Sequence, residues 1–202
     1  MEDMIALLRQ SYIEKIEHHL GKNMIVILTG QRRVGKSCVL RLFKDKISEN
    51  KENNIVYIDK EKYMFDDIRT YHDLNAYIDE HRDPKKMNYI LVDEIQDIDG
   101  FEKSIRSYYE EPDVEIIITG SNSSMLSSDL SNKIGGRYKE IYVQALSYEE
   151  FMDFHNLSDY TGHVLCLIYG LYLRLPHGCQ GYLGFMGNKA NYKKTRRISP
   201  CL

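Results

Sequence analysis

The feature of this chain that most constrains its fold is a glycine-rich stretch of eight residues, Gly30-Gln-Arg-Arg-Val-Gly-Lys-Ser37. It follows an apolar run, Met24 to Thr29, that predicts a buried strand, and it precedes a helical pattern over residues 36–50. Its glycines allow a tight turn between the two elements. A strand that passes directly into a helix begins a βαβ unit, so the stretch favours a parallel sheet covered by helices.

The rest of the chain repeats this alternation of strand and helix. Short apolar runs indicate buried strands, and amphipathic stretches between them indicate helices. Predicted strands cover residues 54–59, 88–93, 114–119 and, from a weaker pattern, 140–143, while further predicted helices cover residues 3–20, 70–82, 102–110, 122–132 and 147–156. The alternation predicts an α/β fold of three layers, with five parallel strands between helices.

Composition narrows the class of protein but identifies no partner. The 202 residues are 43% hydrophobic and 28% charged with a net charge of -3, which is typical of an ordinary globular protein and excludes a disordered chain. The acidic start does not resemble a secretory signal, and the longest apolar stretch, residues 163–175, is shorter than the ~20 residues that span a bilayer. We therefore expect a cytoplasmic protein with no membrane contact. The four cysteines lack metal-ligand spacing, so we expect free thiols and no zinc site.

The last 43 residues differ from the rest of the chain. All 30 acidic residues lie at or before Asp159, so the first 159 residues, with 21 Lys and Arg, carry a formal charge of -9 and the last 43 carry +6. A basic tail is typical of a nucleic-acid or membrane contact. A missing residue class with an abrupt shift in composition also fits a truncated or out-of-frame end, which is the interpretation that we favour. We predict a domain over residues 1–157 and an atypical tail over residues 158–202.

The glycine-rich stretch also predicts chemistry, because it matches the P-loop pattern G-x-x-x-x-G-K-[S/T]. In a P-loop, backbone N–H groups and the start of the following helix face the phosphates of a nucleotide. Lys36 would neutralise the β- and γ-phosphates, and Ser37 would ligate Mg²⁺. The alternative is a glycine turn with a solvated lysine. The predicted nucleotide-binding residues are Gly30, Gln31, Arg32, Arg33, Val34, Gly35, Lys36, Ser37 and Cys38, of which the two arginines receive no separate role.

Two acids, Asp93 and Glu94, follow the apolar run that begins at Tyr89. We expect Asp93 to hold the magnesium shell and Glu94 to deprotonate the water that attacks the γ-phosphate. The alternative is that both acids meet solvent at a strand end. Their place about 55 residues after the P-loop, with strand and helix units between, favours the catalytic interpretation.

Further side chains are candidates for sensing the γ-phosphate. Thr119 ends the next predicted strand, and Ser121 and Asn122 follow it. Any of the three could hydrogen-bond the attacking water, although Ser121 or Asn122 could instead cap the following helix. Arg137, after two glycines, could act as an arginine finger or sensor, or could be an exposed loop charge. The predicted catalytic set is therefore Glu94, Lys36, Arg137, Thr119 and Ser121.

The predicted cofactors are ATP and Mg²⁺. Guanine-binding P-loop proteins usually carry an N-K-x-D run, and Asn132-Lys-Ile-Gly135 lacks the acid, so adenine follows by elimination.

With these motifs in place, the chain resembles a family of prokaryotic AAA-type ATPases in which an N-terminal ATPase domain precedes a C-terminal domain of nuclease-like character. The matching blocks are Thr29-Gly-Gln-Arg-Arg-Val-Gly-Lys-Ser37, Leu91-Val-Asp-Glu-Ile-Gln96, Ile118-Thr-Gly-Ser-Asn-Ser-Ser124, Leu126-Ser127, Gly136-Arg137 and Ala145-Leu-Ser-Tyr-Glu-Glu-Phe151. The resemblance implies a P-loop NTPase sheet of order 5-1-4-3-2, ATP at Gly30 to Ser37, magnesium through Ser37 and Asp93, and Gln96 as a family mark without a known chemical role. The resemblance ends near residue 155, so the second domain is expected to be absent.

These expectations favour an ATP hydrolase that turns over slowly alone, because a homo-oligomeric neighbour would supply an arginine worth roughly 10³ to 10⁵ in rate. A second hypothesis is a nucleotide-controlled module that binds DNA or a protein partner through the second domain, with hydrolysis only resetting it. A P-loop kinase is less favoured, because Glu94 beside Asp93 suits the activation of water.

Overall fold

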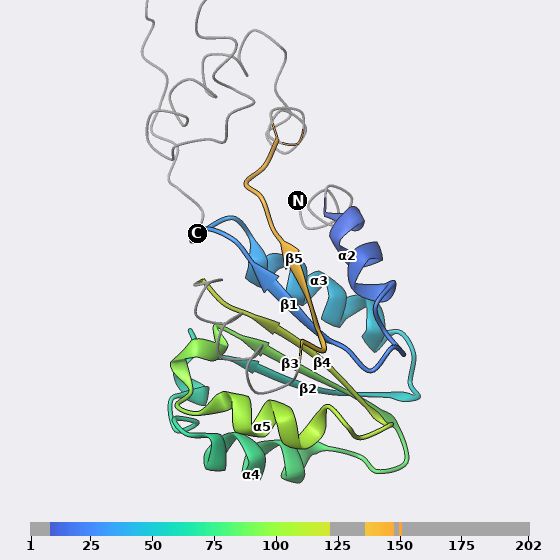
Figure 1. The fold of residues 1–202 in the computed structure, drawn as a ribbon, viewed down its shortest axis with the longest axis vertical. Helices are drawn as coiled ribbons and strands as arrows, with labels where there is room; N and C mark the ends of the chain where they lie inside the picture. The colour runs from blue at the N-terminus through green and yellow to red at the C-terminus, as the bar shows by residue number, and fades with distance from the viewer. Residues whose placement is uncertain (1–8, 122–135, 148–149, 151–202) are drawn as a thin grey trace, which may run out of the picture.

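The computed structural model describes residues 9–121, 136–147 and 150 (Figure 1). Helices and strands alternate along these residues as the sequence patterns predict. The elements are α2 (Gln10–Glu17), β1 (Ile25–Thr29), α3 (Lys36–Ser48), β2 (Asn53–Asp59), the 3-10 turn η1 (Tyr63–Phe65), α4 (Tyr71–His81), β3 (Met87–Asp93), the 3-10 turn η2 (Ile95–Asp97), α5 (Phe101–Tyr108), β4 (Val114–Thr119) and β5 (Tyr138–Tyr142).

The strands form one five-stranded sheet in the order β2-β3-β4-β1-β5, and every neighbouring pair is parallel. This is the predicted order 5-1-4-3-2 counted from the other edge, so the predicted fold class is confirmed. Because all strands point the same way, their carboxyl ends lie together along one end of the sheet. The predicted site residues other than Arg137 lie at or just after the ends of β1, β3 and β4, and they therefore meet there.

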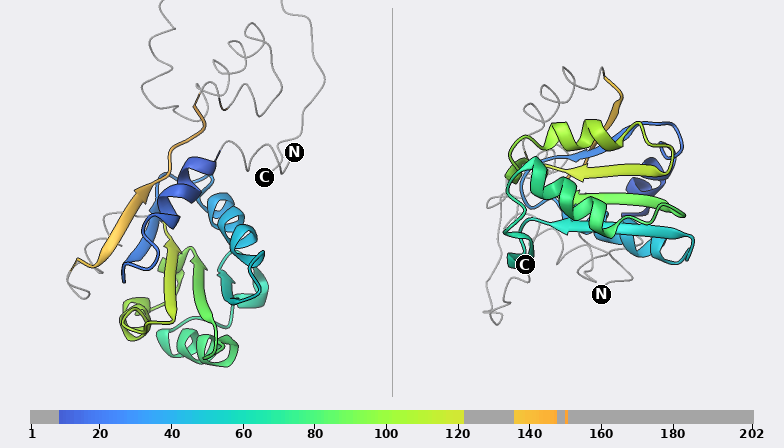
Figure 2. Two further views of the ribbon diagram at one scale, coloured as in Figure 1. Left: turned by 90° about the vertical axis from the view of Figure 1, so that its right-hand side faces the viewer. Right: turned by 90° about the horizontal axis from the view of Figure 1, so that it is seen from below.

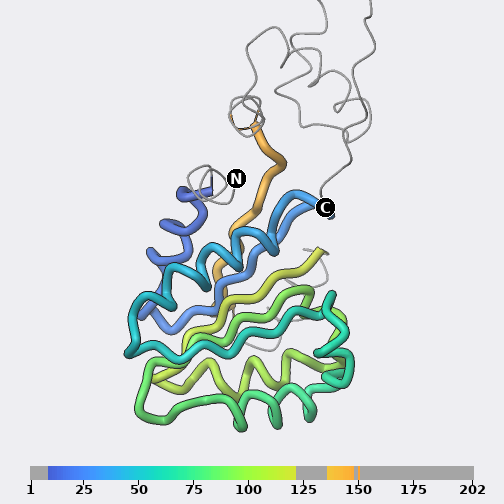
Figure 3. The backbone as a smooth tube through the Cα atoms, turned by 180° about the vertical axis from the view of Figure 1, so that it is seen from behind, coloured from blue at the N-terminus to red at the C-terminus, as the bar shows by residue number. Residues whose placement is uncertain are grey.

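Helices cover both faces of the sheet and make the predicted three layers. Figures 1 and 2 show α4 and α5 together on one face, and Figure 3 shows α3 across the strands on the other, next to α2. Successive residues of a buried strand serve opposite faces. On β1, Ile27 packs in the cluster with α4 and α5, and Leu28 packs in the cluster with α2 and α3.

The last described strand, β5, begins two residues earlier than the sequence predicts. It is an edge strand that pairs only with β1, and its pairing starts at Tyr138 opposite Ile25. Of its five residues only Ile141 is buried, so most of its length carries no apolar signal. Backbone pairing with β1 sets its start, which an apolar run cannot reveal.

Several predictions concern residues outside the described ranges. These are the first part of the helix over residues 3–20, the helices over 122–132 and most of 147–156, the asparagine at 122, the run at 132–135 and the tail over 158–202. Among the cysteines only Cys38 lies in the described residues, and it forms no disulfide with any of them. In the described ranges, no helix has the length and apolar character to cross a membrane.

Candidate functional site: a P-loop at the carboxyl end of the sheet

The loop between β1 and α3 takes a backbone path that depends on its two glycines. Gly30 has a φ of 143°, and a Cβ placed on it would lie 2.3 Å from the carbonyl oxygen of Val143. Gly35, with a φ of 94°, forms the left-handed residue before α3. Side chains at these positions would be strained or would clash, so the spacing of the motif follows from the shape of the loop.

The first turn of α3 leaves a site for an anion. No side chain caps this end of the helix, and its first turn contains no acid. Free N–H groups and the positive end of the helix dipole therefore face the loop. Phosphate groups bind readily at such an end, and the glycine-rich loop brings backbone close to it.

Lys36 begins α3 and turns its side chain back over the loop. Its Nζ donates to the carbonyl oxygens of Gly30 at 3.3 Å and Gln31 at 3.2 Å, and it lies 3.9 Å from Glu94 Oε1. The residue is only 4% exposed. A buried ammonium group at the mouth of a P-loop is placed to neutralise phosphate charge.

Asp93 ends β3 and is fully buried. One carboxyl oxygen, Oδ1, accepts a short hydrogen bond from the Thr119 hydroxyl, while Oδ2 has no partner among the described residues. Burial raises the pKa of Asp93, while the hydroxyls of Thr119 and Ser37 act in the opposite direction. An unpaired, buried carboxyl oxygen beside Ser37 is the kind of atom that a cation satisfies.

Magnesium fits these donors. It is usually bound through one or two carboxylates together with water and substrate phosphates, and not by a complete protein cage. The described residues contain no group of three or more His, Cys, Asp or Glu side chains arranged for a metal. The oxygen of Ser37 and the free oxygen of Asp93 would hold the ion next to the P-loop.

Glu94 follows Asp93 with a left-handed backbone, at a φ of 53° and a ψ of 54°. Such a conformation is strained for a residue with a side chain and persists where the surroundings enforce it. Here the Glu94 N–H donates to Thr119 Oγ1 at 2.9 Å, and the carboxylate accepts from Gln96 Nε2 at 2.5 Å. The Glu94 side chain is held between Gln96 and Lys36.

The structure brings together Lys36, Ser37, Asp93, Glu94 and Thr119, from three elements far apart in the sequence. The Thr119 hydroxyl, predicted to hydrogen-bond the attacking water, donates to the Asp93 carboxylate and accepts from the backbone N–H of Glu94, and the residue is fully buried. The register that pairs Val92 with Ile118 sets Thr119 beside Asp93.

Other predicted residues lie at the rim or away from this group. Ser121, Gln31, Arg32 and Arg33 are exposed. Val34 is buried, and Cys38 is half-buried with a pKa raised by that burial.

Arg137 lies at the opposite end of the sheet from the P-loop. It directly precedes β5, its carbonyl oxygen accepts from Ile25 N at the start of β1, and its guanidinium reaches Tyr109 Oη at 3.5 Å. The length of β1 separates it from the P-loop, about 16 Å at ~3.3 Å per residue. Arg137 therefore cannot sense a phosphate on its own chain's P-loop in this arrangement.

One buried residue near the P-loop was not foreseen from the sequence. Arg9, 4% exposed, donates to the carbonyl oxygens of Val34 at 3.0 Å and Gln144 at 2.9 Å. It thereby joins the start of α2 to the P-loop and to the segment after β5. Its partners are backbone atoms, so the sequence does not indicate these contacts. It indicates only the amphipathic helix itself.

Fold and site together define a P-loop NTPase. The family model of an AAA domain matches residues 22–152, well over half of the chain and all of the site. The chain belongs to this AAA domain family, a family of P-loop ATPases.

Two curated relatives have names that state no function. A protein of Haemophilus influenzae is 29% identical over 153 residues, which are 74% of this chain and 38% of the relative. A protein of Methanocaldococcus jannaschii is 29% identical over 143 residues, which are 71% of this chain and 31% of the relative. The chain thus spans about a third of the length of these relatives.

Solved structures support the fold. Domain III of the replication initiation protein DnaA from Thermotoga maritima matches with a TM-score of 0.52 and 13% identity, over 82% of this chain and 85% of that one. The Hsp104 chain of a Saccharomyces cerevisiae complex with casein matches with a TM-score of 0.54 and 15% identity, over 81% of this chain and 30% of that one.

Proposed function

We propose that this domain binds ATP with Mg²⁺ at the P-loop and hydrolyses it. The observation that carries the proposal is the meeting of Lys36, Asp93 and Glu94 at the uncapped start of α3. A phosphate site there would have a cation for its charge, an unpaired carboxyl oxygen toward the metal and a second carboxylate toward water. Family membership supports the same class of activity.

Each residue has a separate role in the proposed hydrolysis. Backbone N–H groups of the loop and Lys36 would hold the phosphates, while Ser37 and Asp93 would hold Mg²⁺, which neutralises charge on the transferred group. Glu94 would take a proton from the attacking water. Thr119 orients the Asp93 carboxylate and holds the backbone of Glu94 through its hydroxyl, and it is not the group that contacts water in this proposal.

The test compares Glu94→Gln with the unaltered chain. The variant keeps the shape of the side chain but cannot accept the proton, so we expect ATP affinity within about twofold and a loss of turnover of about 10² to 10⁴. Affinity is measured by fluorescence of a labelled ATP analogue, and turnover by release of phosphate from radiolabelled ATP. Equal turnover in both chains would remove Glu94 from the mechanism.

We further propose that Arg137 acts on a neighbouring copy, since its exposed side chain lies too far from its own P-loop. Mixing Glu94→Gln chains with Arg137→Ala chains tests this. Each Arg137→Ala chain keeps an intact site and can receive an arginine from its partner, so the mixture should exceed the summed rates of its components. A mixture that only averages them would argue against action in trans.

A further inference from the structure

Gln96 is a firmly placed polar side chain at the site that the proposed mechanism does not use. It lies on η2, two residues after Glu94, and its Nε2 donates to Glu94 Oε2 at 2.5 Å. The other carboxylate oxygen of Glu94 lies 3.9 Å from Lys36 Nζ. The two oxygens of Glu94 therefore face different groups, the glutamine on one side and the P-loop lysine on the other.

The chemistry of the pair fixes which way the amide of Gln96 points. An ionised carboxylate only accepts hydrogen bonds, so the NH₂ group must face Glu94 and the carbonyl oxygen must face away. That oxygen, Oε1, is buried and has no hydrogen-bond partner among the described residues. A buried acceptor that lacks a donor is costly, and beside the carboxylate proposed to activate water, a water molecule is the donor that would satisfy it.

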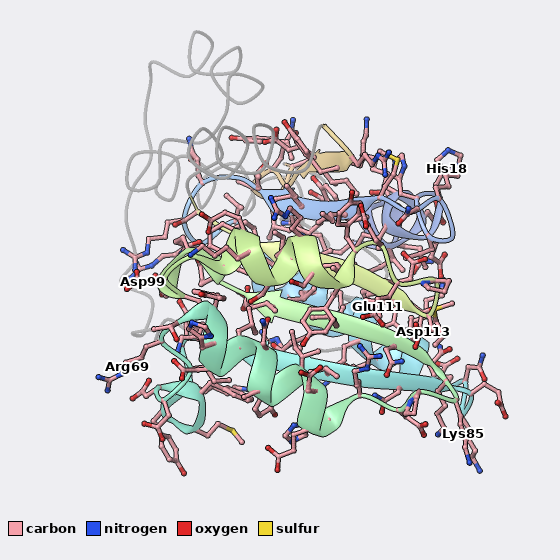
Figure 4. The ribbon with its side chains drawn as sticks, turned by 60° about the horizontal axis from the view of Figure 1, so that its bottom comes forward. His18, Arg69, Lys85, Asp99, Glu111 and Asp113 are labelled. Atoms are coloured by element: carbon pink, nitrogen blue, oxygen red, sulfur yellow. The ribbon has the colours of Figure 1, made fainter. Side chains whose placement is uncertain are left out.

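The backbone around Gln96 holds it in place independently of the Glu94 contact. Ile95 and Ile98, on either side, are fully buried in the core beneath α4 and α5. Asp99 donates its N–H to the Arg69 carbonyl at 2.8 Å and accepts from Tyr71 N at 2.9 Å, which ties the turn to the start of α4. Figure 4 shows Arg69 and Asp99 together at one end of the sheet, opposite the end marked by Glu111 and Asp113.

We infer that Gln96 positions the Glu94 carboxylate with its amide N–H and the attacking water with its Oε1. This rests on the proposed hydrolysis and adds a residue to it. The water oxygen forms the new bond to the γ-phosphorus, and the bond to the bridging oxygen breaks with its electron pair left on ADP. Glu94 takes one water proton, while the other remains on the phosphate product after its hydrogen bond to Gln96 has oriented the attack.

Two variants separate the two contacts. Gln96→Met has a similar length but neither donor nor acceptor, and Gln96→Glu keeps an acceptor but loses the donor to Glu94. We expect a loss in kcat of about 10²-fold for each, as for other small misplacements of reacting groups. ATP affinity should stay within about twofold and the melting temperature should be unchanged. Asp97→Asn, on an exposed residue of the same turn, serves as the matched control and should keep full turnover.

A merely structural role is distinguished by a double-mutant cycle. If Gln96 acts through Glu94 and its water, Gln96→Met should lower the residual single-turnover rate of Glu94→Gln by much less than it lowers the rate of the unaltered chain. The inference would be overturned if the rate losses of the two substitutions multiply fully, or if a loss of ATP affinity or a lower melting temperature accounts for the fall in rate. So would full turnover in Gln96→Met.

The same measurements separate this inference from the proposed function. If Glu94→Gln is inactive while Gln96→Met is fully active, the role of Gln96 is rejected and the proposed hydrolysis is not. An unaltered chain that binds ATP but releases no phosphate in any assembly state would reject hydrolysis and the role of Gln96 together.

Discussion

Buried polar groups at the two ends of strand β3 differ in whether their hydrogen bonds are satisfied. At the start, Asn88 is fully buried, and its side chain accepts from Asn54 Nδ2 at 2.8 Å and Asp83 N at 2.9 Å and donates to the carbonyl oxygens of Asp83 and Lys86, each at 2.9 Å. At the other end, Asp93 is equally buried and keeps one oxygen without a partner among the described residues. Satisfied polar groups stabilise a fold, whereas an unsatisfied buried group needs its own explanation, and at Asp93 the cation proposed beside the P-loop supplies one.

Replacement of Asp93 should produce the largest effect. Asp93→Asn can still accept from Thr119 but loses the charge that would hold the proposed cation, so we expect turnover to fall by about 10³, since a metal supplies several kcal/mol of charge stabilisation. Stability should not fall, because burial disfavours the charged carboxylate and raises its pKa. Phosphate release and thermal melting measure both effects. A large loss of stability with normal turnover would contradict the distinction between Asp93 and Asn88.

Replacement of Asn88 should show the opposite pattern. Asn88→Ala leaves the Asp83 N–H and several carbonyl groups without their partner, so we expect a loss of about 2–4 kcal/mol in the free energy of unfolding. Urea denaturation gives that value. Turnover for each folded molecule should match the unaltered chain, and a fall comparable to that of Asp93→Asn would show that both ends of β3 serve the site.

The smallest expected effect concerns Glu115 on β4. Its carboxylate accepts from Gly21 N at 2.7 Å, yet burial raises its pKa above the ordinary 4.5. The folded state then binds the proton more tightly than the unfolded state, so the stability from this group falls as pH rises from 4.5 through the raised pKa. Glu115→Gln keeps an acceptor for Gly21 and should remove that fall. Denaturation between pH 4 and 8 checks it, and an unchanged pH dependence would contradict the assignment.

The parts of the site that follow local rules were predictable from the sequence. The spacing of Gly30, Gly35 and Lys36 follows from the shape of one turn, and Asp93 and Glu94 follow from the end of a buried strand. The sheet order came from resemblance to a family, because propensity does not specify which strands pair.

Contacts that depend on register or on distant segments could not be predicted. Thr119 reaches Asp93 only because β3 and β4 pair with a particular offset. Arg9 contacts backbone oxygens of two segments, of which one lies 135 residues away. The hydrogen bond from Gln96 occurs beside a left-handed backbone at Glu94, which no pattern in the sequence encodes.

The close approach of Gly30 to Val143 has a mechanical consequence. The space between the loop and the end of β5 does not accommodate a methyl group, and Val143 N also donates to the Thr29 carbonyl at 2.7 Å. The P-loop therefore cannot shift toward β5 without displacing Val143. Any change in loop shape between nucleotide states in that direction would be transmitted directly to the segment by which the chain leaves the sheet.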